Sequence, residues 1–363
     1  SSSSNASWGP AIENLRYDGS TNYPKDKNGQ IVNMDDPTAT DQPVLPYENT
    51  EDFFETAMTN NTYLSMSGGN EMGSYFLSVG NLIQTGIVPK TDFKRTSLKL
   101  SGDTKLSEKL KISGSATYTN SKANHAQRGS NLSAVMVGLM RNTPTFDQTN
   151  QSDDPSNDPE AYMYPNGQQR NYYDQYDNPY WSVNKNRAQS EVNRFIGNAQ
   201  VDYAIAPWLK ALYRIGIDNY TERRNAFFDN NSSDTPNGYV TLSTYNFSGI
   251  NSDLLLSAEK QINEDIKVSG SLGHNYYTKS TYTNSQRGDS LILPNFYNIS
   301  NTAVTEGSDY ETNYNIVGVF YDLHMAYKNF LFLNTTGRND WSSTLAKGNN
   351  SFFYPSVNVS FIF

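Results

Sequence analysis

LKISGSATYT, at residues 110–119, carries an apolar or small side chain at every second position and a charged or hydroxylated one between. The same alternation returns in FIGNAQVDYAI at 195–205 and in IKVSGSLG at 266–273. Successive side chains of a β-strand point to opposite faces, so each segment has one apolar and one polar face. Repeated segments of about ten residues with this pattern are typical of a membrane β-barrel, whereas soluble sandwiches use strands of about five or six.

The composition agrees with a barrel. Among 363 residues, 26 Tyr, 17 Phe and 4 Trp make 13% aromatic, which suits aromatic girdles at the two membrane interfaces. The mean hydropathy of −0.69 is low because channel-facing side chains and polar loops dilute the lipid face. The longest apolar run, Ala134–Met140, is far shorter than the roughly 20 residues of a spanning helix. The absence of Cys excludes disulfides, and the net charge of −9 argues against a nucleic-acid partner.

The pattern predicts eleven strands whose connections are short and long in turn. Bacterial barrels have short periplasmic turns and long extracellular loops, so the long connections are expected outside the cell. The predicted strands are 61–68, 72–83, 92–104, 109–121, 191–205, 208–220, 247–261, 265–279, 310–327, 329–341 and 352–363. The extracellular regions are then 1–59, with a short helix near 50–59, 122–190, with a helix at 131–141, 221–246, with room for a small extra hairpin, and 280–309.

The fold class expected is therefore all-β: an antiparallel up-and-down transmembrane β-barrel segment of about eleven long strands. Single-chain bacterial barrels have even strand numbers, and an open sheet of eleven strands leaves two raw edges. We therefore expect the chain to be a segment of a barrel, with strands at 60–121 and 191–363 and the long loop 122–190 between them.

Seven stretches along the chain carry recognisable motifs: SWGP at 7–10, YDG at 17–19, DFF at 52–54, SGGN at 67–70, YFLSVG at 75–80, QTGIV at 84–88 and GRNDWSSTL at 337–345. Together, and in this order, they resemble the SusC/RagA-like branch of the TonB-dependent outer-membrane transporters of Bacteroidetes. The last stretch, continuing into FYPSV at 353–357, is the strongest match. One small departure is Ala346, where members of the family often carry proline.

The resemblance implies a barrel of about 22 strands with a plug inside, of which this chain is the first half. The signal peptide, the plug domain and the rest of the barrel would then lie outside it. It also implies location in the bacterial outer membrane and import of oligosaccharides or peptides. The expected partners are a SusD-like surface lipoprotein, TonB acting through the plug, the glycan or peptide substrate, and outer-membrane lipid.

Candidate contact residues come from the long loop and from strand parity. Exposed aromatic side chains suit stacking on sugar rings or packing against a partner, although such a cluster can equally form a girdle or the core of the loop itself. The cluster in this loop is Tyr172, Tyr173, Tyr176, Tyr180 and Trp181. Parity places five charged side chains toward the channel, where they are candidates for its wall: Arg194, Asp202, Lys210, Arg214 and Lys267.

No catalytic chemistry is predicted. The three histidines stand alone in the sequence, and no nucleophile, phosphate-loop or zinc motif occurs. The acidic stretch 147–160 lacks the spacing and the glycine of a calcium loop, so a solvated loop is the better interpretation and neither metal nor cofactor is expected. The alternative function is that of a soluble cell-surface β-protein that binds glycans through loop aromatics. A soluble protein would not, however, leave one continuous apolar surface exposed.

Overall fold

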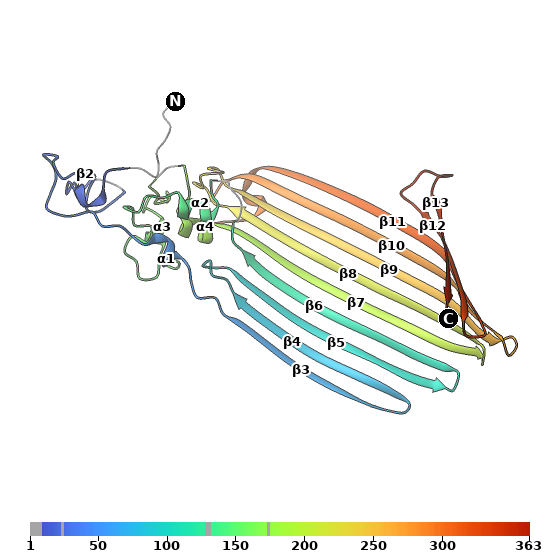
Figure 1. Cartoon of the computed structure of the whole chain (residues 1–363). Coiled ribbons are helices and arrows are strands. Elements are labelled where there is room, and N and C mark those ends of the chain that lie inside the picture. The colour runs from blue at the N-terminus through green and yellow to red at the C-terminus, as the bar shows by residue number, and fades with distance from the viewer. Residues whose placement is uncertain (1–8, 23–24, 128–131, 173–174) are drawn as a thin grey trace.

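An antiparallel sheet of eleven strands is the main feature of the computed structural model, which describes residues 9–22, 25–127, 132–172 and 175–363. Each strand is hydrogen-bonded to its neighbours in chain order, from β3 at one edge to β13 at the other (Figure 1). The strands are β3 (Thr59–Asn70), β4 (Gly73–Thr85), β5 (Asp92–Ser107), β6 (Leu110–His125), β7 (Asn186–Ala206), β8 (Leu209–Phe228), β9 (Tyr239–Gln261), β10 (Ile266–Leu291), β11 (Thr302–Tyr327), β12 (Leu331–Ser342) and β13 (Ser351–Phe361).

The expected antiparallel strands are confirmed within the described residues, but several are much longer than the pattern predicted. Strands β10 and β11 each run for 26 residues. The loops predicted at 221–246 and 280–309 are therefore wrong over most of their length, because β8 to β11 continue through them. The connections that remain there are 229–238 and 292–301. The first turn lies at 71–72 rather than 68–71, since Gly68 and Gly69 pair within the β3–β4 ladder.

One connection remains long, and it runs from the end of β6 to the start of β7. It carries three short helices, α2 (Val135–Met140), α3 (Pro159–Tyr162) and α4 (Pro179–Lys185). The region before β3, predicted as an extracellular region with one short helix, also contains a small sheet, because β1 (Leu15–Tyr17) and β2 (Ile31–Asn33) pair with each other. The remaining elements are α1 (Asn49–Phe53) and the 3₁₀ helices η1 (Ile12–Asn14) and η2 (Ile299–Asn301). In the described part of the chain, no helix is long and apolar enough to cross a membrane.

The two faces of the sheet differ in chemistry, as the alternation predicted. Val201 lies opposite Ile112 on β6 and Tyr213 on β8, so these apolar side chains share what we call the apolar face. Gln200, one residue earlier, lies opposite Ser113 and Arg214 on the polar face. The apolar residues are among the most exposed, with Leu100 at 56%, Leu254 at 43%, Leu272 at 55% and Leu323 at 40%. Such a surface is stable against lipid rather than against water.

The buried core lies outside the sheet. Helices α1 to α4 gather at one end of the strands, beyond β6 and β7 (Figure 1). The largest buried hydrophobic side chains come from these helices and the segments between them. The sheet is thus a wall with two solvated or lipid-facing surfaces, and the helices form a separate packed unit at its end.

Candidate functional site

The five charged candidates for the channel wall all share the polar face. Arg214 of β8 lies opposite Gln200 of β7 and Asp253 of β9, and Asp253 lies opposite Asn275 of β10. Counting along each strand in steps of two from this row reaches every candidate: Arg194 and Asp202 on β7, Lys210 and Arg214 on β8, and Lys267 on β10. The structure therefore brings the five onto one surface, where they come from three strands, β7, β8 and β10.

Ion pairs neutralise most of the charge on this face. Three of the candidates have acidic partners: Arg194 pairs with Asp218 at 2.7 Å, Arg214 with Asp253 at 2.9 Å and Lys267 with Glu259 at 2.8 Å. The carboxylate of Asp202 accepts hydrogen bonds from the Gln200 amide, the shorter at 3.0 Å. Exposed pairs of this kind contribute only about 0–1 kcal/mol each. Their main effect is to give the polar face many hydrogen-bonding groups and little net charge.

A row of rings and cations crosses the polar face nearer the helical end. The rings of Tyr220 on β8 and Phe247 on β9 stack with their centroids 4.9 Å apart. The Arg194 guanidinium lies 5.6 Å from the Tyr220 ring, and the Lys279 ammonium lies 5.8 Å from the Phe247 ring. We call these four residues the cation–aromatic row. Sequence reasoning missed it, although all four have channel parity at the ends of predicted strands.

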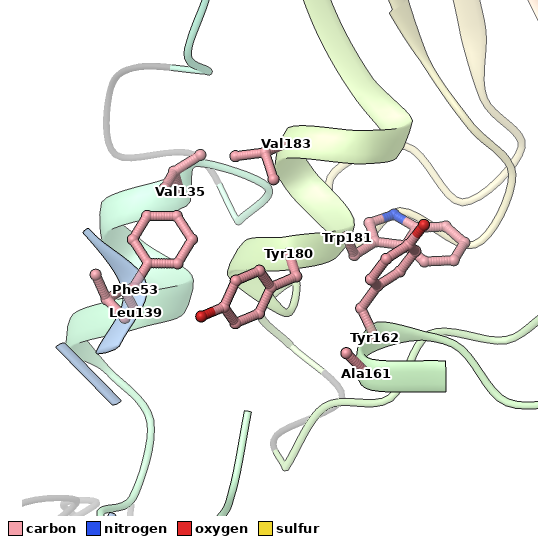
Figure 2. Close-up of a cluster of buried hydrophobic side chains, with 8 residues drawn as sticks. All are labelled: Phe53, Val135, Leu139, Ala161, Tyr162, Tyr180, Trp181 and Val183. Atoms are coloured by element: carbon pink, nitrogen blue, oxygen red, sulfur yellow. The ribbon is translucent and has the colours of Figure 1, made fainter. Parts of the chain in front are cut away.

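The aromatic cluster of the long loop divides into buried and partly exposed members. Tyr180 and Trp181 are each 1% exposed and belong to a buried cluster that we call the loop core: Phe53, Val135, Leu139, Ala161, Tyr162, Tyr180, Trp181 and Val183 (Figure 2). The ring of Tyr180 lies 5.2 Å from that of Phe53, and the ring of Trp181 lies 6.4 Å from that of Tyr162. For Tyr180 and Trp181, the expected contact with substrate or lid is therefore corrected to packing inside the loop.

The other members of the cluster are placed differently. Tyr172 is half-buried, with its ring 5.8 Å from Phe146 and the Lys25 ammonium 5.6 Å from its centroid. The hydroxyl of Tyr176 accepts a hydrogen bond of 3.0 Å from the guanidinium of Arg141, which also lies 5.6 Å from the ring. Tyr173 lies outside the described residues. Tyr172 and Tyr176 therefore remain candidates for contact with a partner.

Helices α3 and α4, which the sequence reasoning missed, begin at an identifiable signal. Each starts with proline at its first position, after an Asx residue whose side chain caps the helix. Asp158 accepts from the backbone N–H of Glu160 at 3.0 Å, and Asn178 accepts from that of Tyr180 at 2.9 Å. An Asx residue followed by proline is a known start signal, because proline at that position loses no hydrogen bond. This Asx-Pro signal could have predicted both helices.

A buried polar joint connects the loop core to β7 and to the 229–238 connection. Asp177 accepts hydrogen bonds of 2.7 Å each from the side chains of Gln169 and Asn186 and from the backbone N–H of Ser233. The indole N–H of Trp181 donates to the Ser232 hydroxyl at 3.0 Å. Burial raises the pKa of Asp177, and the hydrogen bonds partly oppose that rise.

The acidic stretch of the loop caps turns and helices. Asp147 accepts from the backbone and side chain of Thr149 and from the backbone of Gln151, at 2.7–2.8 Å. Among the residues that the structure describes, no three His, Asp or Glu side chains come together in a group that could hold a metal ion. His324 on the polar face contacts Asp322 at 2.9 Å, a pair between exposed side chains of one strand.

Two curated proteins are similar to this chain along most of its length, while no protein-family model matches it. TonB-dependent receptor P26 of Formosa agariphila is 25% identical over 311 residues, which are 82% of this chain and 29% of that protein. TonB-dependent receptor SusC of Bacteroides thetaiotaomicron is 25% identical over 335 residues, 85% of this chain and 31% of that protein. The chain thus spans about a third of the length of either relative.

A solved structure supports the fold. The RagAB peptide importer in its open-open state superposes with a TM-score of 0.72 at 18% identity, covering 87% of this chain and 35% of that one. Eleven antiparallel strands with one apolar face agree with this likeness. The sequence and the fold together confirm the expected resemblance: the chain is similar, over more than four-fifths of its length, to part of a SusC/RagA-like TonB-dependent receptor of the outer membrane.

Proposed function

We propose that this chain forms a wall and an extracellular loop unit of an outer-membrane nutrient importer. The complete receptor would take up oligosaccharides or peptides together with a SusD-like surface lipoprotein, driven by TonB acting on a plug inside the barrel. The chain's own part would be passive, with no catalytic step. The observation that carries this proposal is the similarity, over 82–85% of the chain, to two TonB-dependent receptors.

The chemistry of the sheet supports a transport wall. The apolar face leaves large aliphatic side chains such as Leu256 and Val319 exposed, which favours contact with lipid. The polar face carries paired charges and amide groups. Such a surface is hydrated and can form hydrogen bonds with a polar solute without binding it tightly. The alternative, a soluble glycan-binding protein, is not favoured, because in water the apolar face would drive aggregation.

Within this proposal the outer loops would meet the lid and the substrate. The helices lie at the strand ends joined by the long connection, the side expected to be extracellular. Tyr172 and Tyr176 are the contact candidates that the loop core does not bury. On the polar face, Arg194 and the rest of the cation–aromatic row would face incoming substrate. Asp202, Lys210, Arg214 and Lys267 lie nearer the short turns, where a plug would contact the wall.

The test is uptake by a strain that lacks the complete receptor. We expect the deletion to abolish import of one nutrient class, oligosaccharide or peptide, and the wild-type gene to restore it. A receptor carrying both Tyr172→Ala and Tyr176→Ala should show about 30-fold weaker lid association, because two aromatic contacts each contribute about 1 kcal/mol. Asn166→Ala, an exposed residue of the same loop, is the matched control and should behave as wild type.

The possible results separate two claims. Unchanged uptake of both nutrient classes in the deletion strain would show that the proposed function is wrong. Restored uptake with wild-type lid association in the double variant would keep the importer and reject the two tyrosines as contacts.

A further inference from the structure

The outer border of the apolar face is a sharp line that crosses the strands obliquely. The continuous apolar band on this face ends at Tyr118, Phe195, Ile217, Ile250, Tyr276 and Val317, on β6 to β11 in turn. Beyond it the same face carries scattered apolar residues such as Leu242 and Tyr282. Phe195 lies opposite Asn219 rather than opposite Ile217. The border on β8 therefore lies two residues nearer the short turns than the border on β7. It steps back two more between β9 and β10, where Ile250 lies opposite Thr278.

This slope is close to the tilt of strands in a membrane. Four residues at about 3.4 Å, over the five spacings of about 4.8 Å between β6 and β11, make an incline of about 30°. Strands of outer-membrane barrels tilt by roughly 35–45°, so the border lies within about 5–15° of the membrane plane. The apolar band thus ends at nearly the same height on all six strands, although it ends at different register positions.

Uncharged hydrogen-bonding side chains follow at once beyond the border. The next residues on the same face of β6 to β11 are Asn120, Asn193, Asn219, Ser248, Thr278 and Asn315. Amides and hydroxyls on all six strands give this level a polar, uncharged surface. Contact with water alone would allow charged side chains at this level. Charged side chains do occur two residues further along, at Lys122 and Glu191.

A groove of about 430 Å³ is hollowed into the apolar face at this border. Tyr118 and Phe195 line it on β6 and β7, and Tyr282 lines it on β10. These three rings are 37–46% exposed. Short side chains such as Ser248 and Ser280 lie between them and leave the space open. The groove therefore offers ring faces and hydroxyl groups at the height where the lipid tails end.

Two amides in the groove have their oxygens engaged and their nitrogens free. The Asn193 oxygen accepts from the Tyr118 hydroxyl and from the Asn120 amide, both at 2.8 Å. The Asn246 oxygen accepts from the Thr221 hydroxyl at 2.8 Å. Within the described part of the chain, neither amide nitrogen has a hydrogen-bond acceptor on the protein. Two oriented donors therefore meet whatever occupies the groove.

A basic side chain lies on the outer side of the groove. Arg223 is the next residue after Thr221 on the same face of β8, and its side chain is exposed. It lies opposite Glu191, which already pairs with Lys122 at 3.3 Å. The two cations and one carboxylate leave a net positive charge at the outer rim of the groove.

We propose that this groove binds the sugar headgroup of a glycolipid in the outer leaflet of the surrounding membrane. The acyl chains would lie on the apolar face beside Ile217 and Ile250. The sugar ring would pack against Tyr118, Phe195 or Tyr282, and its hydroxyls would accept from the amides of Asn193 and Asn246. Arg223 would pair with a phosphate on that sugar. The site needs the sheet to lie in the membrane but is independent of what the receptor imports.

The test is the complete receptor purified from its own membrane, with bound lipid measured by mass spectrometry. We expect wild type to retain glycolipid and to gain thermal stability when it is added back. Phospholipid without sugar and the free sugar should give no such gain. The double variant Asn193→Leu, Asn246→Leu should bind glycolipid about tenfold more weakly, because it loses two donors at nearly constant volume.

Controls keep the outcome decisive. Asn315→Leu changes the same polar line outside the groove and should bind as wild type. Tyr282→Ser removes one ring and should also weaken binding, which tests the groove if the double variant does not assemble. Arg223→Gln should remove the preference for phosphorylated over unphosphorylated glycolipid. Equal binding by wild type and both groove variants would overturn the proposal, as would equal stabilisation by sugar-free phospholipid or by the free sugar.

Discussion

Single buried side chains join segments that are far apart in the sequence. Trp181 packs against Tyr162 and donates its indole N–H to Ser232, which lies on the 229–238 connection. Gly138 of α2 approaches the Asp177 carbonyl so closely that a Cβ there would lie 2.1 Å from that oxygen. At these positions the packing of the loop core depends on the shape of the side chain and on its hydrogen bond, as well as on its hydrophobicity. The loop core is therefore sensitive to substitutions that leave the sheet untouched.

We predict that Trp181→Ala loosens the loop unit without unfolding the barrel. Removing a fully buried tryptophan costs about 3–5 kcal/mol, and the Ser232 hydroxyl loses the hydrogen bond that it accepts while keeping the one that it donates to Asn186. Hydrogen exchange of the complete receptor should show faster exchange in α2 and α4 by that free energy, with β6 to β9 unchanged. Met136→Ala, on the exposed side of α2, should leave exchange as in wild type. Equal protection in the two variants would contradict the role given to Trp181.

At the scale of elements, the strands continue where their apolar pattern stops. Between 219 and 228 and between 278 and 291 both faces of β8 and β10 are largely polar, yet the ladder runs on through backbone hydrogen bonds. These portions lie beyond the border of the apolar band, so neither face needs aliphatic side chains. A strand is thus divided into a lipid-facing part, defined by its side chains, and an outer part held by its neighbours.

We expect a charge to be tolerated on one part of β8 and not on the other. Ile215→Lys places an ammonium on the apolar face within the band and should destabilise the receptor by about 2–4 kcal/mol. Asn225→Lys makes the same charge on the same face of the same strand, beyond the border, and should be nearly neutral. Chemical unfolding of the complete receptor in liposomes measures both. A similar loss of stability in the two variants would mean that the band is misplaced.

For the molecule as a whole, the sheet has two edges. Strands β3 and β13 each pair with one neighbour only, and their exposed side chains include Leu64, Met66, Val357 and Val359. Unpaired backbone donors and acceptors on a long apolar edge recruit further strands. The packed loop core is small beside the sheet and cannot compensate for these edges.

We therefore predict that residues 1–363, produced alone in detergent, associate through β3 and β13. Size-exclusion chromatography with light scattering should show a broad distribution of oligomers, whereas the complete receptor in the same detergent should be uniform. A single monomeric species that melts cooperatively would contradict this prediction.

The sequence by itself determined the two-faced strands, their antiparallel order and the resemblance to one class of receptor. Alternation within a strand such as 110–119 is a property of consecutive residues, so it can be recognised in the sequence without knowledge of the fold. The tertiary structure decided what depends on distant contacts. It buried Tyr180 and Trp181 through Phe53 and Tyr162, joined Asp177 to the 229–238 connection, and extended β8 to β11 through polar stretches that have no apolar pattern of their own. Hydrogen bonds between neighbouring backbones keep those stretches extended. Such bonds do not require a particular side-chain pattern, so the sequence does not reveal them.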